Sequence, residues 1–195
     1  MPMWRGFAGL VLALAVIPSS LAAPGKPLSA YSRETWTTRN GLPHNQVNAV
    51  AQTSDGYLWF ATWEGLVRYN GQDFRVLNPD NTPALKDHGV RQVSVGPSGR
   101  MVVATSRGGI SVREDGAWRH FGKAEGLAQN ETMGAIDGGD GSIWVAHESE
   151  GLSHIAADGK ITVWNTGNGL PADRLYAVYR DRHDAIWAAT AQGMA

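Results

Sequence analysis

The amino-acid sequence repeats itself about every 43 residues along nearly its whole length. One column of the repeat recurs at spacings of 43, 42 and 43 residues and holds Leu42, Leu85, Leu127 and Leu170. A second column recurs at the same spacings and holds Trp59, Val102, Trp144 and Trp187. A fixed period in the 40s, carried by glycines and aromatic residues, is typical of stacked or radial repeat proteins. The period therefore restricts the chain to a fold in which one small unit recurs.

Each unit has the pattern of four short β-strands. In the first unit, residues 47–52 alternate apolar and polar side chains, as a half-buried strand does. Ser54-Asp55-Gly56 predicts a turn, because glycine readily takes the positive φ of a tight hairpin. Residues 57–62 are rich in aromatic side chains and predict a second strand. Further turns separate a third strand at 66–70 from a fourth at 73–77.

Four antiparallel strands within one period form one blade of a β-propeller. We therefore predict an all-β fold, a β-propeller with three complete blades and part of a fourth. The predicted blades span residues 43–82, 86–123, 129–167 and, truncated, 172–195. Residues 35–39, which include Trp36, align with the outermost strands of later units. They predict a strand that closes the last blade of a ring.

The predicted ring is incomplete, because a closed propeller has about four to eight blades. We interpret the chain as the N-terminal part of a longer protein, with a native protein of three and a half blades as the alternative. In both cases the last blade would expose an apolar face and an unpaired strand edge to water, which favours aggregation.

The first 22 residues have the features of a secretory signal peptide. Arg5 supplies a positive charge, residues 6–17 are an apolar stretch, and Ser20-Leu21-Ala22 is a cleavage site with small residues at its first and last positions. A transmembrane helix would need about 20 apolar residues, so an uncleaved anchor is the weaker alternative. No cysteine is present, which excludes a lipoprotein anchor. The sequence predicts a signal peptide at 1–22 and an exported chain at 23–195.

The charge of the exported chain argues against a nucleic-acid partner. Without Arg5 it carries 16 Lys and Arg residues against 18 Asp and Glu residues, a net charge of −2. A dedicated nucleic-acid binder would show a basic surface. The absence of cysteine means that packing alone must hold the exported fold together.

The tryptophans divide by their place in the repeat. Trp59, Trp144 and Trp187 share one strand position and predict packing between neighbouring blades. The predicted outer-strand tryptophans are Trp36, Trp118 and Trp164. Trp63 lies in a turn, where it predicts either an exposed ring that stacks on a ligand or a buried anchor of the loop.

The repeat resembles the two-component regulator propeller repeat. The resemblance rests on residues 40–50 (Asn-Gly-Leu-Pro-x-Asn-x-Val-x-Ala-Val) and 55–66 (Asp-Gly-x-Leu-Trp-Phe-Ala-Thr-x-x-Gly-Leu). Parts of it return at 141–146 and 185–190. The second unit departs from the pattern, with Val102 in place of the tryptophan and Ile110 in place of the leucine. The resemblance covers roughly residues 36–195.

The resemblance implies a sensor. Propellers of this family are similar to the periplasmic halves of bacterial transmembrane regulators, whose output is a histidine kinase or diguanylate cyclase module. It implies a non-enzymatic, periplasmic ligand-sensing region that binds a small molecule such as a carbohydrate or a peptide. Contact with the membrane would come only through segments beyond these residues. A dimer is one of the oligomeric states that we consider for the full-length protein. No cofactor is expected.

The blade topology places candidate ligand-binding residues on one face. Chain direction reverses at each strand, so the loops from strand two to strand three lie on the same face as the connections between blades. Loops on a rigid scaffold often carry binding residues. The candidates on this face are His44, Asn45, Trp63, Glu64, His88, Arg107, Asn130, Glu148, Asp173 and Arg174. For any one of them, a solvated loop or a local capping role is the more frequent alternative.

The sequence predicts neither a metal site nor a nucleophilic active site. The six histidines lack the spacing of metal ligands, and Asp137-Gly138-Gly139-Asp140-Gly141 has the composition of a tight turn rather than a calcium loop. One enzyme reading stays open, because streptogramin lyases are propellers with similar short blades and a catalytic histidine. A free periplasmic lyase of that kind would need a histidine and a glutamate from different blades to converge, for instance His88 with Glu148. A protein-binding scaffold is the other alternative.

Overall fold

The computed structural model describes residues 27–195, which fall into two units divided after Thr35. The first unit contains a 3-10 turn at Leu28–Ala30, in which the Ala30 N–H donates to the Pro27 carbonyl over 2.8 Å. The second unit comprises Trp36–Ala195. The predicted signal peptide, residues 1–22, lies outside the described residues.

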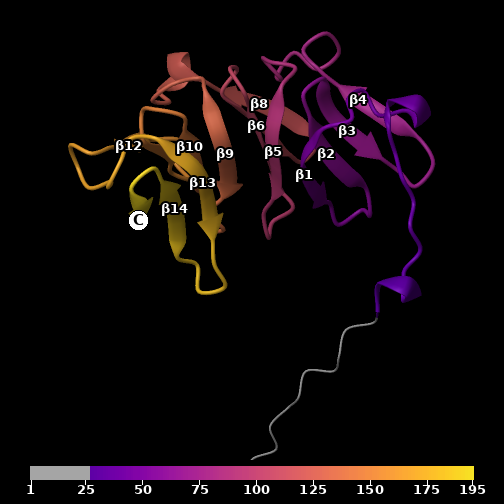
Figure 1. Cartoon of the computed structure of the whole chain (residues 1–195). Helices are drawn as coiled ribbons and strands as arrows, with labels where there is room; N and C mark the ends of the chain where they lie inside the picture. Colours follow the sequence, from indigo (N-terminus) through magenta and orange to yellow (C-terminus); the bar gives the residue numbers. More distant parts are fainter. Residues whose placement is uncertain (1–26) are drawn as a thin grey trace, which may run out of the picture. The chain divides into compact units, whose positions relative to one another are not determined.

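The second unit consists of four antiparallel sheets (Figure 1), each with its strands in sequence order. Blade 1 contains β1 (Val47–Gln52), β2 (Leu58–Thr62), β3 (Gly65–Tyr69) and β4 (Phe74–Leu77). Blade 2 contains β5 (Val90–Val95), β6 (Met101–Thr105), β7 (Ile110–Glu114) and β8 (Ala117–Phe121). Blade 3 contains β9 (Thr132–Asp137), β10 (Ile143–His147), β11 (Leu152–Ile155) and β12 (Ile161–Trp164). Blade 4 contains β13 (Leu175–Arg180), β14 (Ile186–Thr190) and β15 (Gly193–Met194).

The predicted fold class is therefore confirmed: the unit has three four-stranded blades and one partial blade. The innermost strands β1, β5, β9 and β13 are neighbours in that order (Figure 1). Short 3-10 turns at Thr38–Asn40 and Lys123–Glu125 precede blades 1 and 3.

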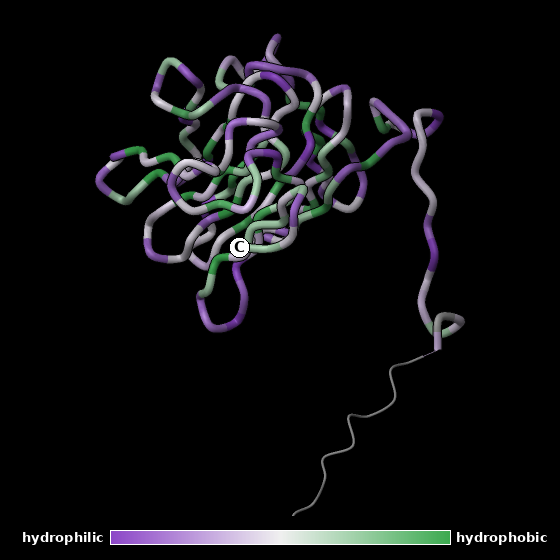
Figure 2. Tube along the Cα trace, turned by 60° about the vertical axis from the view of Figure 1, so that its left-hand side comes forward, coloured by the Kyte–Doolittle hydropathy of each residue, from purple (hydrophilic) through white to green (hydrophobic). Residues whose placement is uncertain are grey.

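Apolar side chains from facing sheets fill the space between successive blades. Trp59 of blade 1, which is 3% exposed, packs with Met101 and Val103 of blade 2. A second cluster joins Val112 of blade 2 to Val145 of blade 3, and a third cluster joins blades 3 and 4. In Figure 2 the hydrophobic stretches lie mainly in the densely packed middle of the tube, whereas the outer loops are mostly hydrophilic. Each blade thus completes its core with its neighbours.

The two outward faces of this series of blades differ. On blade 1, the Trp36 ring packs on Tyr69, Phe74 and Phe60, with ring centroids 4.8, 5.8 and 5.9 Å away. The packing position of Trp59 is repeated in blade 4 by Trp187, which is 43% exposed. Blade 4 therefore presents the uncovered apolar face that the repeat predicts.

The predicted closing strand at residues 35–39 has no strand pairing here. Residues 38–40 form a 3-10 turn instead, with the Thr37 side chain as its N-cap. Trp36 covers the outer aromatic residues of blade 1 rather than lying in a paired strand. A closing role would require a partner strand in a further blade, so it stays a prediction.

A buried ion pair links blades 2 and 3. Arg100, in the turn between β5 and β6, donates to the Asp137 carboxylate over 2.6 Å, and the two side chains are only 10% and 3% exposed. The same guanidinium donates to the carbonyls of Gly141 and Ser142 over 2.9 and 2.8 Å. Gly96 leaves room for this pair, because a Cβ there would lie 2.3 Å from the carboxylate carbon of Asp137. The predicted tight turn at 137–141 therefore also serves as an inter-blade contact.

We expect Asp137→Asn to lower the free energy of unfolding by about 3 kcal/mol, because it leaves the Arg100 charge buried without its anionic partner. Chemical denaturation monitored by tryptophan fluorescence measures the change. Asp184→Asn is the matched control: it removes the same charge from the exposed pair between Arg180 and Asp184 (2.7 Å). It should cost less than about 1 kcal/mol. Equal losses in the two variants would contradict a structural role for the Arg100 pair.

Candidate functional site

The turns between the second and third strands of each blade are built alike. In three blades the second strand ends in a threonine whose hydroxyl donates to the carbonyl of a glycine at, or directly before, the start of the third strand. These bonds measure 2.7, 2.9 and 2.8 Å and join Thr62 to Gly65, Thr105 to Gly109 and Thr190 to Gly193. The three glycines have positive φ, which a side chain would disfavour. The residues between threonine and glycine, two in blades 1 and 4 and three in blade 2, are therefore held on a fixed turn.

Backbone hydrogen bonds join these turns to the connections between blades. Ser106 donates to the Gly89 carbonyl over 2.7 Å, and Gly109 donates to the Asn130 carbonyl over 2.8 Å. The same arrangement recurs one blade later, from Gly151 to Asp173 over 2.8 Å. The two kinds of loop thus form one surface, as the topology predicts. We call this surface, formed by the β2–β3, β6–β7, β10–β11 and β14–β15 turns and the connections between blades, the loop face.

A cleft of about 350 Å³ opens on the loop face between blades 1 and 2. Its lining residues are Trp63, Glu64, Asp87, His88, Gly89, Ser106 and Arg107. The structure thus brings together four of the predicted candidates, Trp63, Glu64, His88 and Arg107. We call this the loop-face cleft.

One wall of the loop-face cleft is the half-buried indole of Trp63. A Cβ on Gly89 would lie 2.9 Å from the indole Cε3, so only glycine lets the ring lie this close to the chain. The Asp87 carboxylate accepts hydrogen bonds from the backbone N–H groups of Arg107 (2.8 Å) and Gly89 (3.3 Å). These bonds fix the blade connection against the β6–β7 turn. The Trp63 side chain is therefore partly buried against the chain at Gly89 and partly exposed.

The cleft carries charges of both signs. Glu64 and Arg107 are exposed, and within residues 27–195 neither forms an ion pair. His88 lies 3.7 Å from Asp80, which is also exposed. The cleft therefore combines an aromatic ring, a carboxylate and a guanidinium in its lining.

Each innermost strand has a β-bulge at the same repeat position, close to the loop face. The strand register shifts once in each of the four inner pairs, leaving Asn48, Arg91, Met133 and Tyr176 without a partner. Bulges redirect side chains and are frequent beside functional sites. Sequence reasoning missed these residues, because a bulge adds no recognisable residue type to an alternating strand.

Arg91 links three blades beneath the loop face. Its guanidinium carbon lies 5.7 Å from the Trp63 ring of blade 1, and its Nη2 lies 3.6 Å from the Glu148 carboxylate of blade 3. It also contacts Ser106 Oγ over 3.4 Å and Met133 Sδ over 2.9 Å. Arg91 therefore bridges side chains of blades 1, 2 and 3.

The other predicted residues lie outside the cleft, and three of them have capping roles. Asn45 and Asn130 each accept a backbone N–H seven residues earlier in the chain, over 2.8 and 2.7 Å. Asp173 accepts the Thr166 N–H over 2.6 Å in the same way. His44 accepts the Gln46 N–H over 3.0 Å. Arg174 stacks over Tyr176 at 5.7 Å.

The pair given as an example for the lyase reading has other contacts. His88 lies beside Asp80, and Glu148 lies beside Arg91. Within residues 27–195, no group of three or more His, Cys, Asp or Glu side chains is placed to hold a metal ion.

His147 of blade 3 takes the place of the threonine that ends the second strand in the other blades. Its side chain is fully buried, and its Nε2 lies 2.7 Å from Ser153 Oγ. Burial lowers the pKa of His147 from 6.5 to about 4. The imidazole beneath Glu148 is therefore neutral at pH 7.

The predicted repeat resemblance is confirmed by comparison with protein families. Residues 41–64 match the model of the family described as two component regulator propeller. These residues cover the start of blade 1 and its first loop-face turn. Among curated proteins, no sequence matches the chain significantly.

Solved structures share the propeller fold at low sequence identity. The extracellular domain of BT3049 from B. thetaiotaomicron, described as a hybrid two component system, has a TM-score of 0.57 and 20% identity; the match covers 83% of this chain and 30% of that one. The corresponding domain of BT4673 from B. thetaiotaomicron has a TM-score of 0.64 and 19% identity, covering 83% of this chain and 21% of that one. The chain thus spans less than a third of either domain.

Virginiamycin B lyase from Staphylococcus aureus is a third similar structure. Its TM-score is 0.59 at 18% identity, and the match covers 77% of this chain and 51% of the lyase. At this identity the likeness concerns the fold alone. Across the described residues, no helix has both the length and the apolar character needed to cross a membrane.

We expect the stability of the protein to fall as the pH drops from about 6.5 to about 4, in part because of His147. In this range the unfolded chain binds a proton at this position, whereas the folded chain, with its pKa at about 4, does not. The stabilising contribution is complete above pH 6.5, and up to about 3 kcal/mol of it is lost by pH 4. His147→Thr, which restores the residue of the other blades, should unfold with a weaker dependence on pH. Thermal unfolding at several pH values compares it with the exposed control His183→Gln. Parallel pH profiles for wild type and His147→Thr would contradict this role.

Proposed function

We propose that residues 36–195 belong to the ligand-sensing propeller of an exported bacterial signal-transduction protein. The match to the two component regulator propeller model and the shared fold of extracellular domains support this proposal. On this proposal the region binds a ligand without transforming it. A separate output module, outside these residues, converts binding into a signal.

The observation that carries the proposal is the connection of the loop-face cleft to three blades. Trp63 of blade 1 forms a cleft wall, and Arg91 of blade 2 lies between this ring and Glu148 of blade 3. A ligand that stacks on the indole would compete with Arg91 for the same ring. The Arg91 guanidinium would then leave the Trp63 ring and move closer to the Glu148 carboxylate. Ligand binding would in this way alter the contact between blades 2 and 3.

The composition of the cleft favours a small polar ligand. An indole offers a flat apolar surface to a sugar ring or a peptide side chain, and Glu64 and Arg107 offer an acceptor and donors beside it. Sites with one aromatic wall and a few polar groups usually obtain specificity from the polar groups. We propose an oligosaccharide or a short peptide as the ligand class.

The proposed location is the periplasm. The predicted signal peptide at 1–22 and the extracellular origin of the BT3049 and BT4673 domains support export. Signal transmission across the membrane would depend on segments beyond the described residues.

We expect a ligand of the oligosaccharide or peptide class to raise the melting temperature of the wild-type protein, because a ligand that binds only the folded state stabilises it. A thermal-shift screen identifies the ligand, and titration calorimetry measures its Kd. Arg107→Ser, which introduces the residue found in blade 3 at Ser149, should raise that Kd about tenfold or more through loss of a charged donor. Trp63→Leu should weaken binding similarly.

Arg182→Ser is the control for these variants. It removes an exposed arginine from the β13–β14 turn, which lies at the end of blade 4 away from the loop face. It should leave the Kd unchanged. A screen in which no oligosaccharide or peptide shifts the wild-type melting temperature would count against the cleft as a sensor site. If the protein converts the ligand and a chelator stops this turnover, the proposed function would be that of a lyase rather than a sensor.

A further inference from the structure

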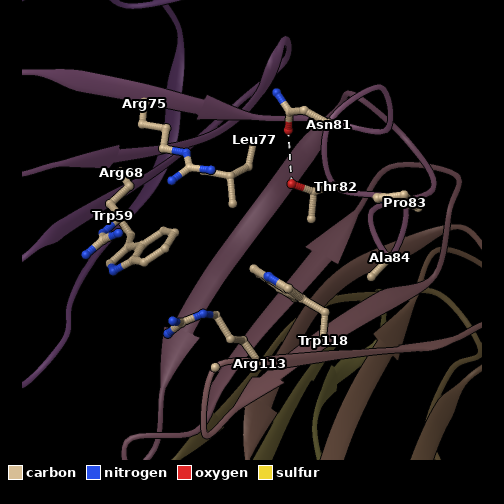
Figure 3. A pocket seen from close by; sticks show the side chains of 11 residues that line it. Trp59, Arg68, Arg75, Leu77, Asn81, Thr82, Pro83, Ala84, Arg113 and Trp118 are labelled. Carbon is tan, nitrogen blue, oxygen red and sulfur yellow. Dashed lines mark hydrogen bonds between the residues drawn. The ribbon is translucent and has the colours of Figure 1, made fainter.

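A second cavity of about 350 Å³ lies between the outer strands of blades 1 and 2, apart from the loop-face cleft. Figure 3 shows Trp59, Arg68 and Arg75 on one side of it and Arg113 and Trp118 on the other. Its remaining wall is formed by Leu77, residues 81–84 and Gly116. No residue of the lining carries a negative charge. We call this cavity the arginine groove.

Strand register places the charged residues of the arginine groove in two rows. In blade 1, Trp59 of β2 pairs with Arg68 of β3, and Arg68 pairs in turn with Arg75 of β4. In blade 2, Arg113 of β7 pairs with Trp118 of β8. Directly paired residues project on the same side of a sheet. The two rows therefore present three guanidinium groups and two indoles to one space.

The three guanidinium groups lack anionic partners. Within residues 27–195, Arg68, Arg75 and Arg113 form no ion pair and no side-chain hydrogen bond. Arg68 stacks on the Tyr57 ring at 3.4 Å, and its Nε is buried without a hydrogen-bond partner. The charge of Arg68 contributes to the lowered pKa of Asp55, after the larger effect of the Thr53 hydroxyl, but Asp55 forms no ion pair with it. A buried donor without an acceptor costs stability unless a ligand supplies the acceptor.

The like charges of this row are not a requirement of the fold. Two positive side chains directly opposite each other on neighbouring strands destabilise a sheet. The same three row positions hold Val102, Val112 and Arg119 in blade 2, and Trp144, His154 and Thr162 in blade 3. Only blade 1 of these three therefore pairs arginine with arginine. Blades 2 and 3 show that the position accepts uncharged residues.

The cavity between blades 2 and 3 provides an internal comparison. It measures about 180 Å³ and is lined by Arg100 and Arg119 together with Glu114 and Asp158. The Arg100 guanidinium is fully engaged with Asp137 and two carbonyl groups. That cavity has its own carboxylates, whereas the arginine groove has none.

We propose that the arginine groove binds an oxyanion, a phosphate, sulfate or carboxylate group, carried on a small ring. Planar guanidinium groups match such oxyanions in geometry and charge. The volume of the cavity exceeds what a lone oxyanion needs and falls in the range of small-molecule sites, about 300–1,000 Å³. The half-buried Trp118 indole supplies a surface for the ring. This site is independent of the loop-face cleft and does not rest on the proposed sensor function.

The test compares matched probes that differ only in the anionic group. Titration calorimetry at constant ionic strength measures binding of glucose 6-phosphate, glucose 6-sulfate and glucose to the full chain. The two anionic sugars should bind, and glucose should not. Inorganic phosphate and inorganic sulfate should bind at least tenfold more weakly than the sugar esters, because they make no contact with an indole. Equal affinities for the inorganic anions would overturn the role of the ring.

The test variant takes its residue from blade 3 of the same protein. Arg75→Thr introduces the residue found at Thr162 and should raise the Kd for glucose 6-phosphate at least tenfold. Arg119→Thr makes the same change at the equivalent position of blade 2 and should leave the Kd unchanged. Without ligand, Arg75→Thr should melt no lower than wild type, because it removes a repulsive contact.

Three further results would overturn the proposal. The first is no binding of either anionic sugar at concentrations up to about 10 mM, the limit of a useful affinity for a small site. The second is an equal loss of binding in Arg75→Thr and Arg119→Thr. The third is a large fall in the melting temperature of ligand-free Arg75→Thr, since this would assign the arginine to the stability of blade 1. Loss of binding in Arg75→Thr alone, at an unchanged melting temperature, supports the proposal.

Discussion

The contact between the faces of neighbouring sheets is the interaction on which the rest of the structure depends. Each four-stranded sheet has two faces, and most of the buried side chains lie in the interfaces between neighbouring blades. Trp59 is nearly fully buried because blade 2 covers it, and the equivalent Trp187 is exposed because no blade does. The packing of blade 1 against blade 2 therefore sets the geometry of the loop-face cleft.

Both candidate sites lie along the same boundary, between blades 1 and 2. The loop-face cleft lies where the turns meet the blade connection, and the arginine groove lies between the outer strands. The apolar cluster that contains Trp59 and Leu85 packs between the same two blades. A ligand bound at either site would therefore contact both sheets and affect their relative position.

The repeat in the sequence was sufficient to predict the fold class and the loop face, because period and turn chemistry are local properties. It also identified Trp63 and Arg107, which stand in turns. It did not identify Arg91, because the bulge that redirects this side chain depends on strand register. The row of Trp59, Arg68 and Arg75 was missed for a related reason, since residues far apart in sequence become neighbours only through cross-strand pairing. Asn130 and Asp173 are predicted as ligand-binding candidates with local capping as the alternative, and their side chains accept hydrogen bonds that cap the loops that carry them.

The outward face of blade 1 is covered and that of blade 4 is bare, so the two ends of the series of blades differ in stability. Because each blade contacts mainly its neighbours, its stability is a sum of its own hydrogen bonds and the contacts on either side, as in a one-dimensional array. Trp36 supplies blade 1 with a cap that blade 4 lacks. Local opening should therefore begin at blade 4 and proceed toward blade 1, so that amide protons in β13 and β14 exchange with solvent before those in β2 and β3.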